Sequence, residues 1–108
     1  MFEFIRTYAN SLKLHSQFGR AHKLHMLDRY KEALSILDSI MSSNPPWHLK
    51  AMALSEQGEI EYRLGNYDKS IELLEEFKSY VSDISDQPSI NEQIQHADEI
   101  INAARSQT

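Results

Sequence analysis

The feature that most constrains this chain is an internal repeat at a shift of 37 residues. Residues 28–38 align with residues 65–75 without a gap, and Tyr30 falls on Tyr67. In both blocks a turn residue precedes the aromatic, a small residue follows three positions later and a large aliphatic seven positions later. Such self-similarity is typical of architectures in which each unit buries its apolar face against a neighbouring unit. Because the spacing is helical, the repeat predicts consecutive helical hairpins.

The rest of the chain favours the same fold class. Glycine and proline are rare, with three of each, and they separate the helical segments at Pro45-Pro46, Gly65 and Pro88. Between these points apolar residues recur three and four positions apart, and no alternating β-branched run with a hairpin signal is present. We therefore expect an all-α chain that forms a single domain over residues 1–108.

The two blocks resemble the tetratricopeptide repeat family, whose unit is a helix–turn–helix of 34 residues. The first copy covers residues 14–47 and the second covers residues 51–84. The residues that carry the resemblance are Ala21, Ala33, Leu37, Ile40 and Pro45 in the first copy, and Leu54, Gly58, Gly65, Tyr67, Ser70, Leu74 and Phe77 in the second. Leu24 lies where the family has an aromatic residue. The resemblance implies an alpha-alpha superhelix with a concave inner groove.

Some family positions carry other residues. Arg20 and Gln57 replace leucine, Glu61 replaces an aromatic, Ser82 replaces proline, and three extra residues separate the copies. The segment from Gly65 to Ile71 therefore carries most of the likeness.

The flanking segments are expected to cover the ends of the repeats, because two hairpins leave an apolar face open at each end. Residues 89–106 are predicted to form a capping helix, with capping-box spacing between Ser89 and Glu92. Residues 1–13 are predicted to form an N-terminal helix that runs on into the first repeat. Its aromatic side chains, Phe2, Phe4 and Tyr8, make this helix our candidate seam for a homodimer.

Composition excludes several classes of function. The chain has no cysteine, so thiolate metal sites, disulfides and cysteine nucleophiles are excluded. The net charge of −5, with scattered Lys and Arg, argues against nucleic acid as a partner. No apolar run approaches the roughly 20 residues of a membrane span, and the N-terminus lacks the pattern of an export signal. We expect a cytoplasmic protein with no membrane partner and no cofactor.

Histidines offer the main alternative chemistry. His15, His22 and His25 share one helical face, and His22 and His25 could hold a zinc or nickel ion. The spacing fixes no third ligand, and Asp28 is the only near candidate. The simpler interpretation, which we adopt, is that they contribute aromatic surface to the first repeat and bind no metal. Since no phosphate loop, nucleophile elbow or zinc-protease motif is present, we predict that the chain is not an enzyme.

The family's groove is lined by the first helix of each repeat. Carried over to this chain, that implies a partner-binding groove formed by Phe18, His22, His25, Met52, Ser55, Glu59, Tyr62 and Arg63. Phe18 could instead belong to the core. Trp47 is either a plug over the gap between the copies or an exposed anchor, and we favour the largely buried plug, since tryptophan is usually well buried.

The resemblance and the composition together predict an adaptor or scaffold that holds a peptide or partner protein in this groove. A small cytosolic chaperone for an export substrate is the second hypothesis. A His-dependent metal-binding protein or hydrolase is the third, from another class.

Overall fold

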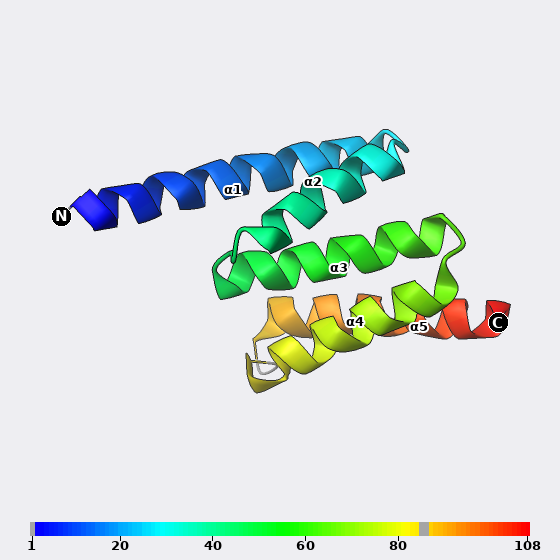
Figure 1. Cartoon of the computed structure of the whole chain (residues 1–108). Helices are drawn as coiled ribbons and strands as arrows, with labels where there is room; N and C mark the ends of the chain where they lie inside the picture. The colour runs from blue at the N-terminus through cyan, green and yellow to red at the C-terminus, as the bar shows by residue number, and fades with distance from the viewer. Residues whose placement is uncertain (1, 85–86) are drawn as a thin grey trace. The chain divides into compact units, whose positions relative to one another are not determined.

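The computed structural model describes the backbone of residues 2–84 and 87–108, and the side chains of these residues except 2–4 and 7. The described chain is helical, with five α-helices and one short 3₁₀ turn, and no described residue lies in a strand (Figure 1). The elements are α1 (Phe2–Met26), α2 (Tyr30–Ser42), α3 (Trp47–Arg63), α4 (Tyr67–Val81), η1 (Ser82–Ile84) and α5 (Pro88–Gln107). The predicted all-α class is confirmed.

The chain divides into two compact units, residues 1–53 and residues 54–108. The division falls inside α3, between Ala53 and Leu54, and therefore inside the second predicted repeat. The first unit contains α1, α2 and the first turns of α3. The second contains the remainder of α3, then α4, η1 and α5.

In the first unit, α1 is one uninterrupted helix of 25 residues, which includes the predicted N-terminal helix and the first helix of the first repeat. It packs along α2. Gly19 does not break α1, because a single glycine inside a helix costs only about 1 kcal/mol relative to alanine. It lies on the exposed side of the helix, where a β-carbon would meet nothing within 4 Å. The buried apolar side chains of this unit are Leu14, Ala21, Ala33, Leu37, Ile40, Leu49, Ala51 and Ala53.

The turn from α1 to α2 satisfies the last carbonyl groups of α1 through backbone hydrogen bonds. The N–H of Arg29 donates to the carbonyl of Leu24 at 2.9 Å, and the N–H of Asp28 donates to the carbonyl of His25 at 3.0 Å. Asp28 has a left-handed backbone conformation, with φ 61°. This pair of bonds around one left-handed residue is the Schellman motif, a common end for an α-helix.

In the second unit, the turn from α3 to α4 repeats this pattern 37 residues later. The N–H of Asn66 donates to the carbonyl of Glu61 at 2.9 Å, and the N–H of Gly65 donates to that of Tyr62 at 3.0 Å. Gly65 is the left-handed residue, with φ 83°. The two turns therefore share one backbone geometry.

The two tyrosines of the repeat also have matching neighbours. The rings of Tyr30 and His25 lie 5.9 Å apart with 61° between their planes. The rings of Tyr67 and Tyr62 lie 5.6 Å apart with 60° between their planes. In both units, the first aromatic of the second helix packs on the residue five positions earlier.

Close packing of α3 on α4 depends on two small residues. The hydroxyl of buried Ser70 donates to the carbonyl of Gly58 at 2.7 Å. A β-carbon at Gly58 would come within 2.5 Å of the Leu74 side chain, so only glycine fits there without a shift. The other buried side chains of this unit are Leu54, Ile60, Leu73, Phe77, Val81, Ala97, Ile100, Ile101 and Ala104, with Glu56 and Gln57.

Helix α5 begins slightly earlier than the capping-box interpretation predicts. Its N-cap is Gln87, and Pro88 occupies the first turn, so Ser89 lies inside the helix. The physical reason is that the fixed φ of proline suits the first helical position, where no N–H is needed. Ile90, Ile94, Ala97, Ile101 and Ala104 form an apolar stripe along α5, of which the last three are buried, and α5 packs on α4.

Two further observations concern surface properties. The prediction that Trp47 is largely buried is wrong, because Trp47 begins α3 with 53% of its surface exposed. None of the helices that the structure describes combines the length and the apolar character that crossing a bilayer requires.

Candidate partner-binding surfaces

The predicted groove residues of the first unit differ in their exposure. His22 and Met52 are exposed, Phe18 is half-buried, and His25 is buried with 2% of its surface accessible. The rings of His22 and His25 lie 6.2 Å apart, edge to face. Within this unit, His22 and Met52 lie on the surface, whereas His25 contributes almost no accessible surface.

The predicted residues of the second unit are linked to one another. Arg63 forms an ion pair with Glu59 at 3.3 Å, one helical turn away. Tyr62 packs on Tyr67, and Ser55 is half-buried further back along α3. These side chains form a mixed aromatic and charged surface on the last turns of α3.

Sequence reasoning missed one member of this surface. The ring nitrogen Nε2 of His96, on α5, lies 3.7 Å from the Glu59 carboxylate. The apolar stripe of α5 contains the adjacent residue Ala97, and this stripe predicts which face of α5 is buried. It does not predict which neighbouring side chain reaches Glu59, because that depends on how α5 packs in its unit.

The metal-site alternative can be tested inside the first unit. Asp28, the third ligand that the sequence suggested for His22 and His25, instead accepts a hydrogen bond from the Tyr30 hydroxyl at 2.8 Å. Among the described residues of 1–53, no third carboxylate or imidazole completes a three-ligand set with these two rings. A two-ligand arrangement is all that this unit provides there.

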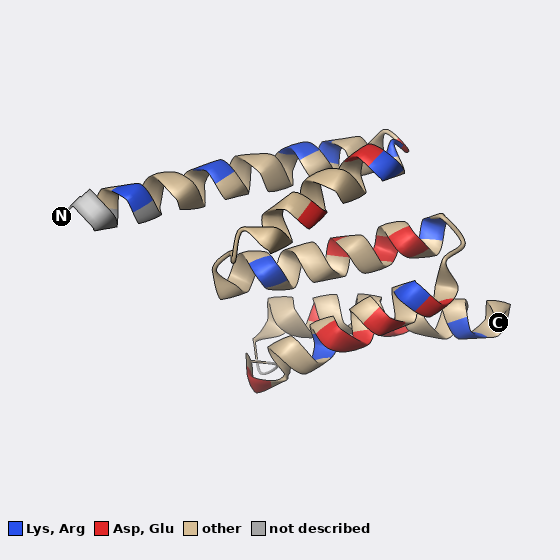
Figure 2. Cartoon of the chain, viewed as in Figure 1, with Lys and Arg blue, Asp and Glu red and all other residues tan. Residues whose placement is uncertain are grey.

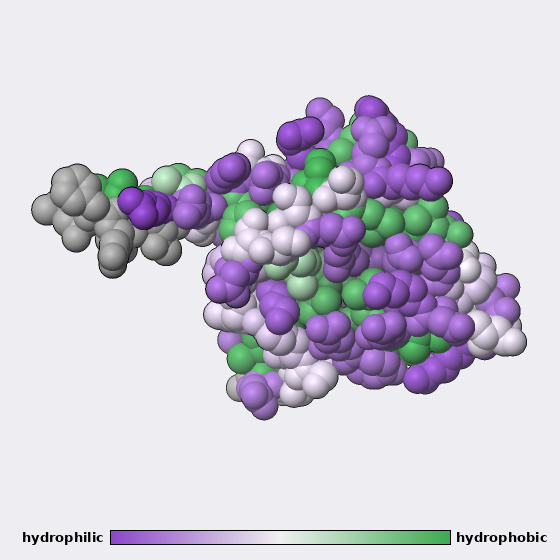
Figure 3. All heavy atoms as spheres, in the orientation of Figure 1, coloured by the Kyte–Doolittle hydropathy of each residue, from purple (hydrophilic) through white to green (hydrophobic). Residues whose placement is uncertain are grey.

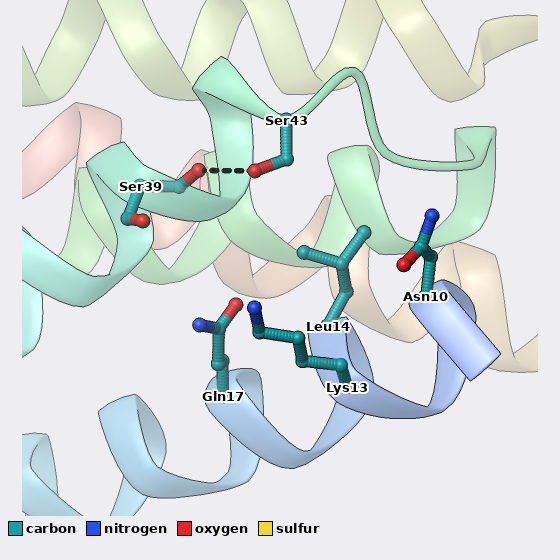
Figure 4. A pocket seen from close by; sticks show the side chains of 6 residues that line it. All are labelled: Asn10, Lys13, Leu14, Gln17, Ser39 and Ser43. Carbon is teal, nitrogen blue, oxygen red and sulfur yellow. Dashed lines mark hydrogen bonds between the residues drawn. The ribbon is translucent and has the colours of Figure 1, made fainter. Parts of the chain in front are cut away.

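A cavity of about 250 Å³ lies between α1 and the end of α2 (Figure 4). The side chains from α1 point toward α2 in this view, and the Ser43 hydroxyl donates to the Ser39 carbonyl at 2.9 Å. The lining residues are Asn10, Lys13, Leu14, Gln17, Ser39 and Ser43. Lys13 supplies the only charge in this lining, so the cavity suits a small polar or anionic group.

This cavity was not predicted from the sequence. Its α1 residues are spaced by three, one and three positions, so they share one helix face, and that signal was available. Three of them are polar and the fourth is the buried Leu14, a mixture that does not by itself indicate a cavity. The cavity also depends on where α2 ends beside α1, which is set by the Asn44–Pro46 link, where Asn44 has φ 51°. Helical periodicity does not predict where a helix ends relative to its neighbour.

Charge is divided unequally between the two units. Residues 1–53 hold seven Lys and Arg against four Asp and Glu, a net charge of +3. Residues 54–108 hold four against twelve, a net charge of −8. Figure 2 shows acidic residues along α4 and the later turns of α3, and basic residues at intervals along α1. The positive charges are therefore less evenly scattered than the sequence analysis assumed.

Two ion pairs join α4 to α5 in the acidic unit. The Lys78 amine on α4 donates to the Asp98 carboxylate on α5, and this hydrogen bond raises the pKa of Lys78 above its usual 10.5. A second ion pair, Arg105 to Glu75 at 3.0 Å, also joins α5 to α4. Both pairs lie on the surface and fix α5 against α4.

Exposed apolar residues mark the N-terminal part of α1. Ile5, Tyr8 and Leu12 are exposed and follow one another by three and four positions, so they share a helix face. Figure 3 shows hydrophobic and hydrophilic atoms intermixed along this part of the chain. The side chains of Phe2 and Phe4, which were also predicted for a homodimer seam, lie outside the described residues.

Comparisons of the chain with models of protein families, with curated proteins and with solved structures found no match.

Proposed function

We propose that this chain is a protein-interaction module, a cytoplasmic adaptor or scaffold that binds a partner polypeptide. The observation that supports the proposal most is the 37-residue repetition of one turn geometry, with a left-handed residue, two matching hydrogen bonds and an aromatic pair in each unit. Repeated helical hairpins of the tetratricopeptide type present helix faces to other polypeptides, and the sequence resembles that family.

The surface that we assign to the partner lies in residues 54–108. Glu59, Tyr62, Arg63 and His96 lie on α3 and α5 of this unit, with Glu59 contacting both Arg63 and His96. The unit carries a net charge of −8, which attracts a positively charged segment. Tyr62 adds an aromatic surface on which an apolar or cationic side chain can pack. We therefore propose a partner segment that contains Lys or Arg.

The experiment is a selection of random displayed peptides on the purified chain, followed by affinity measurements on the selected peptides. We expect enrichment of Lys and Arg, and binding that weakens as salt rises. Glu59→Gln removes the charge at the centre of the assigned surface and is expected to weaken binding by about tenfold, since a hydrogen-bonded charge contributes about 1.5–3 kcal/mol.

The matched control is Glu72→Gln. It makes the same chemical change in the same unit, at an exposed carboxylate on α4 that pairs only loosely with Lys69 at 3.9 Å. Its affinity is expected to equal that of the wild type. Equal losses from the two variants would show a general effect of charge and would remove the assignment to this surface. Failure to select any peptide would remove the proposed function itself.

Self-association through α1 is the second part of the proposal. Ile5, Tyr8 and Leu12 expose one apolar face, and a second copy of α1 would cover it. Light scattering across protein concentration is expected to show a dimer whose dissociation constant rises when Tyr8 is replaced by Glu. A monomer at every concentration would rule out this seam.

A further inference from the structure

Two histidines far apart in the sequence meet in the first unit. The Nε2 atoms of His15, on α1, and His48, in the first turn of α3, lie 3.1 Å apart. Their ring centroids are 5.1 Å apart with 31° between the planes. Both side chains are exposed, so ions and water reach the pair. Neither the groove nor the cavity described above includes this pair.

The hydrogen bonds of His15 define its tautomer. Its Nδ1 lies 2.7 Å from the backbone carbonyl of Ser11. A carbonyl only accepts hydrogen bonds, so Nδ1 of His15 carries a hydrogen. In the neutral ring, Nε2 then presents a lone pair toward His48, whose Nε2–H donates to it. Histidines that bind metals show this arrangement, in which the other ring nitrogen donates to a carbonyl and orients the ligand.

The position of His48 follows from the chain around it. The carbonyl of Pro46 accepts hydrogen bonds from the N–H groups of Leu49 and Lys50, at 3.1 and 3.0 Å, which starts α3 at Trp47. Leu49 is fully buried and anchors this first turn. His48 is therefore held beside α1 by the first turn of α3, which Leu49 anchors.

The separation of the two nitrogens matches the spacing of two ligands on one metal ion. Two nitrogens that each lie about 2.0–2.1 Å from a zinc ion are about 3.3 Å apart at a tetrahedral angle and about 2.9 Å apart at a right angle. The observed 3.1 Å falls between these values. Imidazole is a preferred ligand of zinc, copper and nickel.

We propose that His15 and His48 form a two-imidazole site for a divalent transition-metal ion of the zinc and nickel class. On binding, the hydrogen on Nε2 of His48 moves to Nδ1 of the same ring, so that both Nε2 lone pairs face the ion and no net proton is lost. Among the described residues, no third His, Asp or Glu joins this pair. The remaining positions of the ion are therefore open to water or to a ligand from another molecule.

The experiment uses the whole chain without an affinity tag. Zn²⁺ is titrated in a calorimeter, and Ni²⁺ is titrated while the fluorescence of Trp47 is recorded. Trp47 is the only tryptophan of the chain, and its ring lies 5.9 Å from that of His48, edge to face. We expect saturable binding of one ion per chain, with quenching of Trp47 by Ni²⁺. His15→Gln and His48→Gln are each expected to weaken the binding of Zn²⁺ at least about tenfold.

Two further variants make the result specific. His96→Gln removes an exposed histidine of the second unit and is expected to leave Zn²⁺ binding unchanged. His22→Gln tests the other histidine pair, and a loss of binding in this variant but not in His15→Gln would overturn the proposal. Circular dichroism confirms that each variant folds. Absence of saturable binding, or equal binding in wild type and a His15→Gln, His48→Gln double variant, would also overturn it.

Discussion

The turn between α1 and α2 and the turn between α3 and α4 share one backbone path but are built from different residues. In the first, the left-handed position is Asp28, whose carboxylate accepts a hydrogen bond from Tyr30. In the second, it is Gly65, which needs no side-chain partner. Glycine adopts the left-handed conformation without steric strain, and an Asp whose side chain makes a local hydrogen bond adopts it with less strain than most other residues. The fold therefore requires a conformation at this position rather than a particular residue.

The small residues behind these turns show a similar difference. In the second unit, Gly58 and Ser70 are joined by a hydrogen bond. The positions 37 residues earlier hold Ala21 and Ala33, which are both completely buried. One unit combines the smallest residue with a hydroxyl, and the other combines two methyl groups. Exchanging residues between matching positions of the two units tests whether the helices of each unit pack in the same way.

The largest effect is expected at Gly58. Gly58→Ala places a methyl group against Leu74, and overpacking of this kind costs about 1–3 kcal/mol of unfolding free energy. Urea unfolding followed by circular dichroism measures this loss. The reverse exchange, Ala21→Gly, is expected to cost about 1–2 kcal/mol, because it lowers helix propensity and removes a buried methyl group. Equal and small losses at both positions would show that α3 and α4 are not held as closely as the structure indicates.

The left-handed positions come next. Gly65→Ala is expected to destabilise the chain by about 1–2 kcal/mol, because an L-residue is strained at φ 83°. Asp28→Gly relieves that strain and loses only an exposed hydrogen bond, so a change within about 0.5 kcal/mol is expected. Thermal unfolding compares the two. A large loss in Asp28→Gly would mean that the Tyr30 contact, rather than the backbone, maintains the first turn.

A smaller effect is expected from the buried hydroxyl. Ser70→Ala removes the hydrogen bond to the Gly58 carbonyl and is expected to cost about 1 kcal/mol. Ala33→Ser places a hydroxyl at the matching position of the first unit. If the units are equivalent there, this hydroxyl finds the carbonyl of Ala21, and the cost stays below that of an unpaired buried hydroxyl, about 1–3 kcal/mol. Denaturant unfolding of both variants separates these outcomes.

The smallest effect concerns the ion pair between Lys78 and Asp98 in the second unit. The pKa of Lys78 is higher in the folded chain than in the unfolded chain, because Lys78 donates a hydrogen bond to Asp98. The ion pair therefore stabilises the fold fully below the unfolded pKa of Lys78, and this stabilisation is lost as pH rises through the folded pKa. Asp98→Asn is expected to cost less than about 1 kcal/mol near neutral pH, since both groups are partly exposed. The difference from wild type should vanish in strongly alkaline solution, and a difference that persists there would have another origin.

Local signals predicted much of the fold. Pro45-Pro46 and Gly65 separate helices as predicted, and α5 begins at Pro88, one residue before the predicted start of the capping helix. Each of these depends on a few neighbouring residues, such as a turn conformation or a fixed φ, so a single sequence is enough to indicate it.

The candidate sites were harder to predict, because they depend on where one element meets another. His48 and His15 are 33 positions apart, and their meeting follows from the path of the chain through Asn44–Pro46. The same path leaves Trp47 on the surface, although tryptophan is usually well buried. His96 reaches Glu59 only through the packing of α5 within its unit. Periodicity predicts which face of a helix is buried, but it does not predict which residue of another helix lies against that face.

The division of the chain inside α3 has a consequence for cooperativity. Hydrogen bonds of an α-helix join residues four apart, so several of them cross the point between Ala53 and Leu54. If either unit unfolded alone, α3 would have to end there, with new unsatisfied groups and no cap. The shared helix therefore penalises partial melting, and we expect the two units to lose structure together, as neighbouring units of a linear array do.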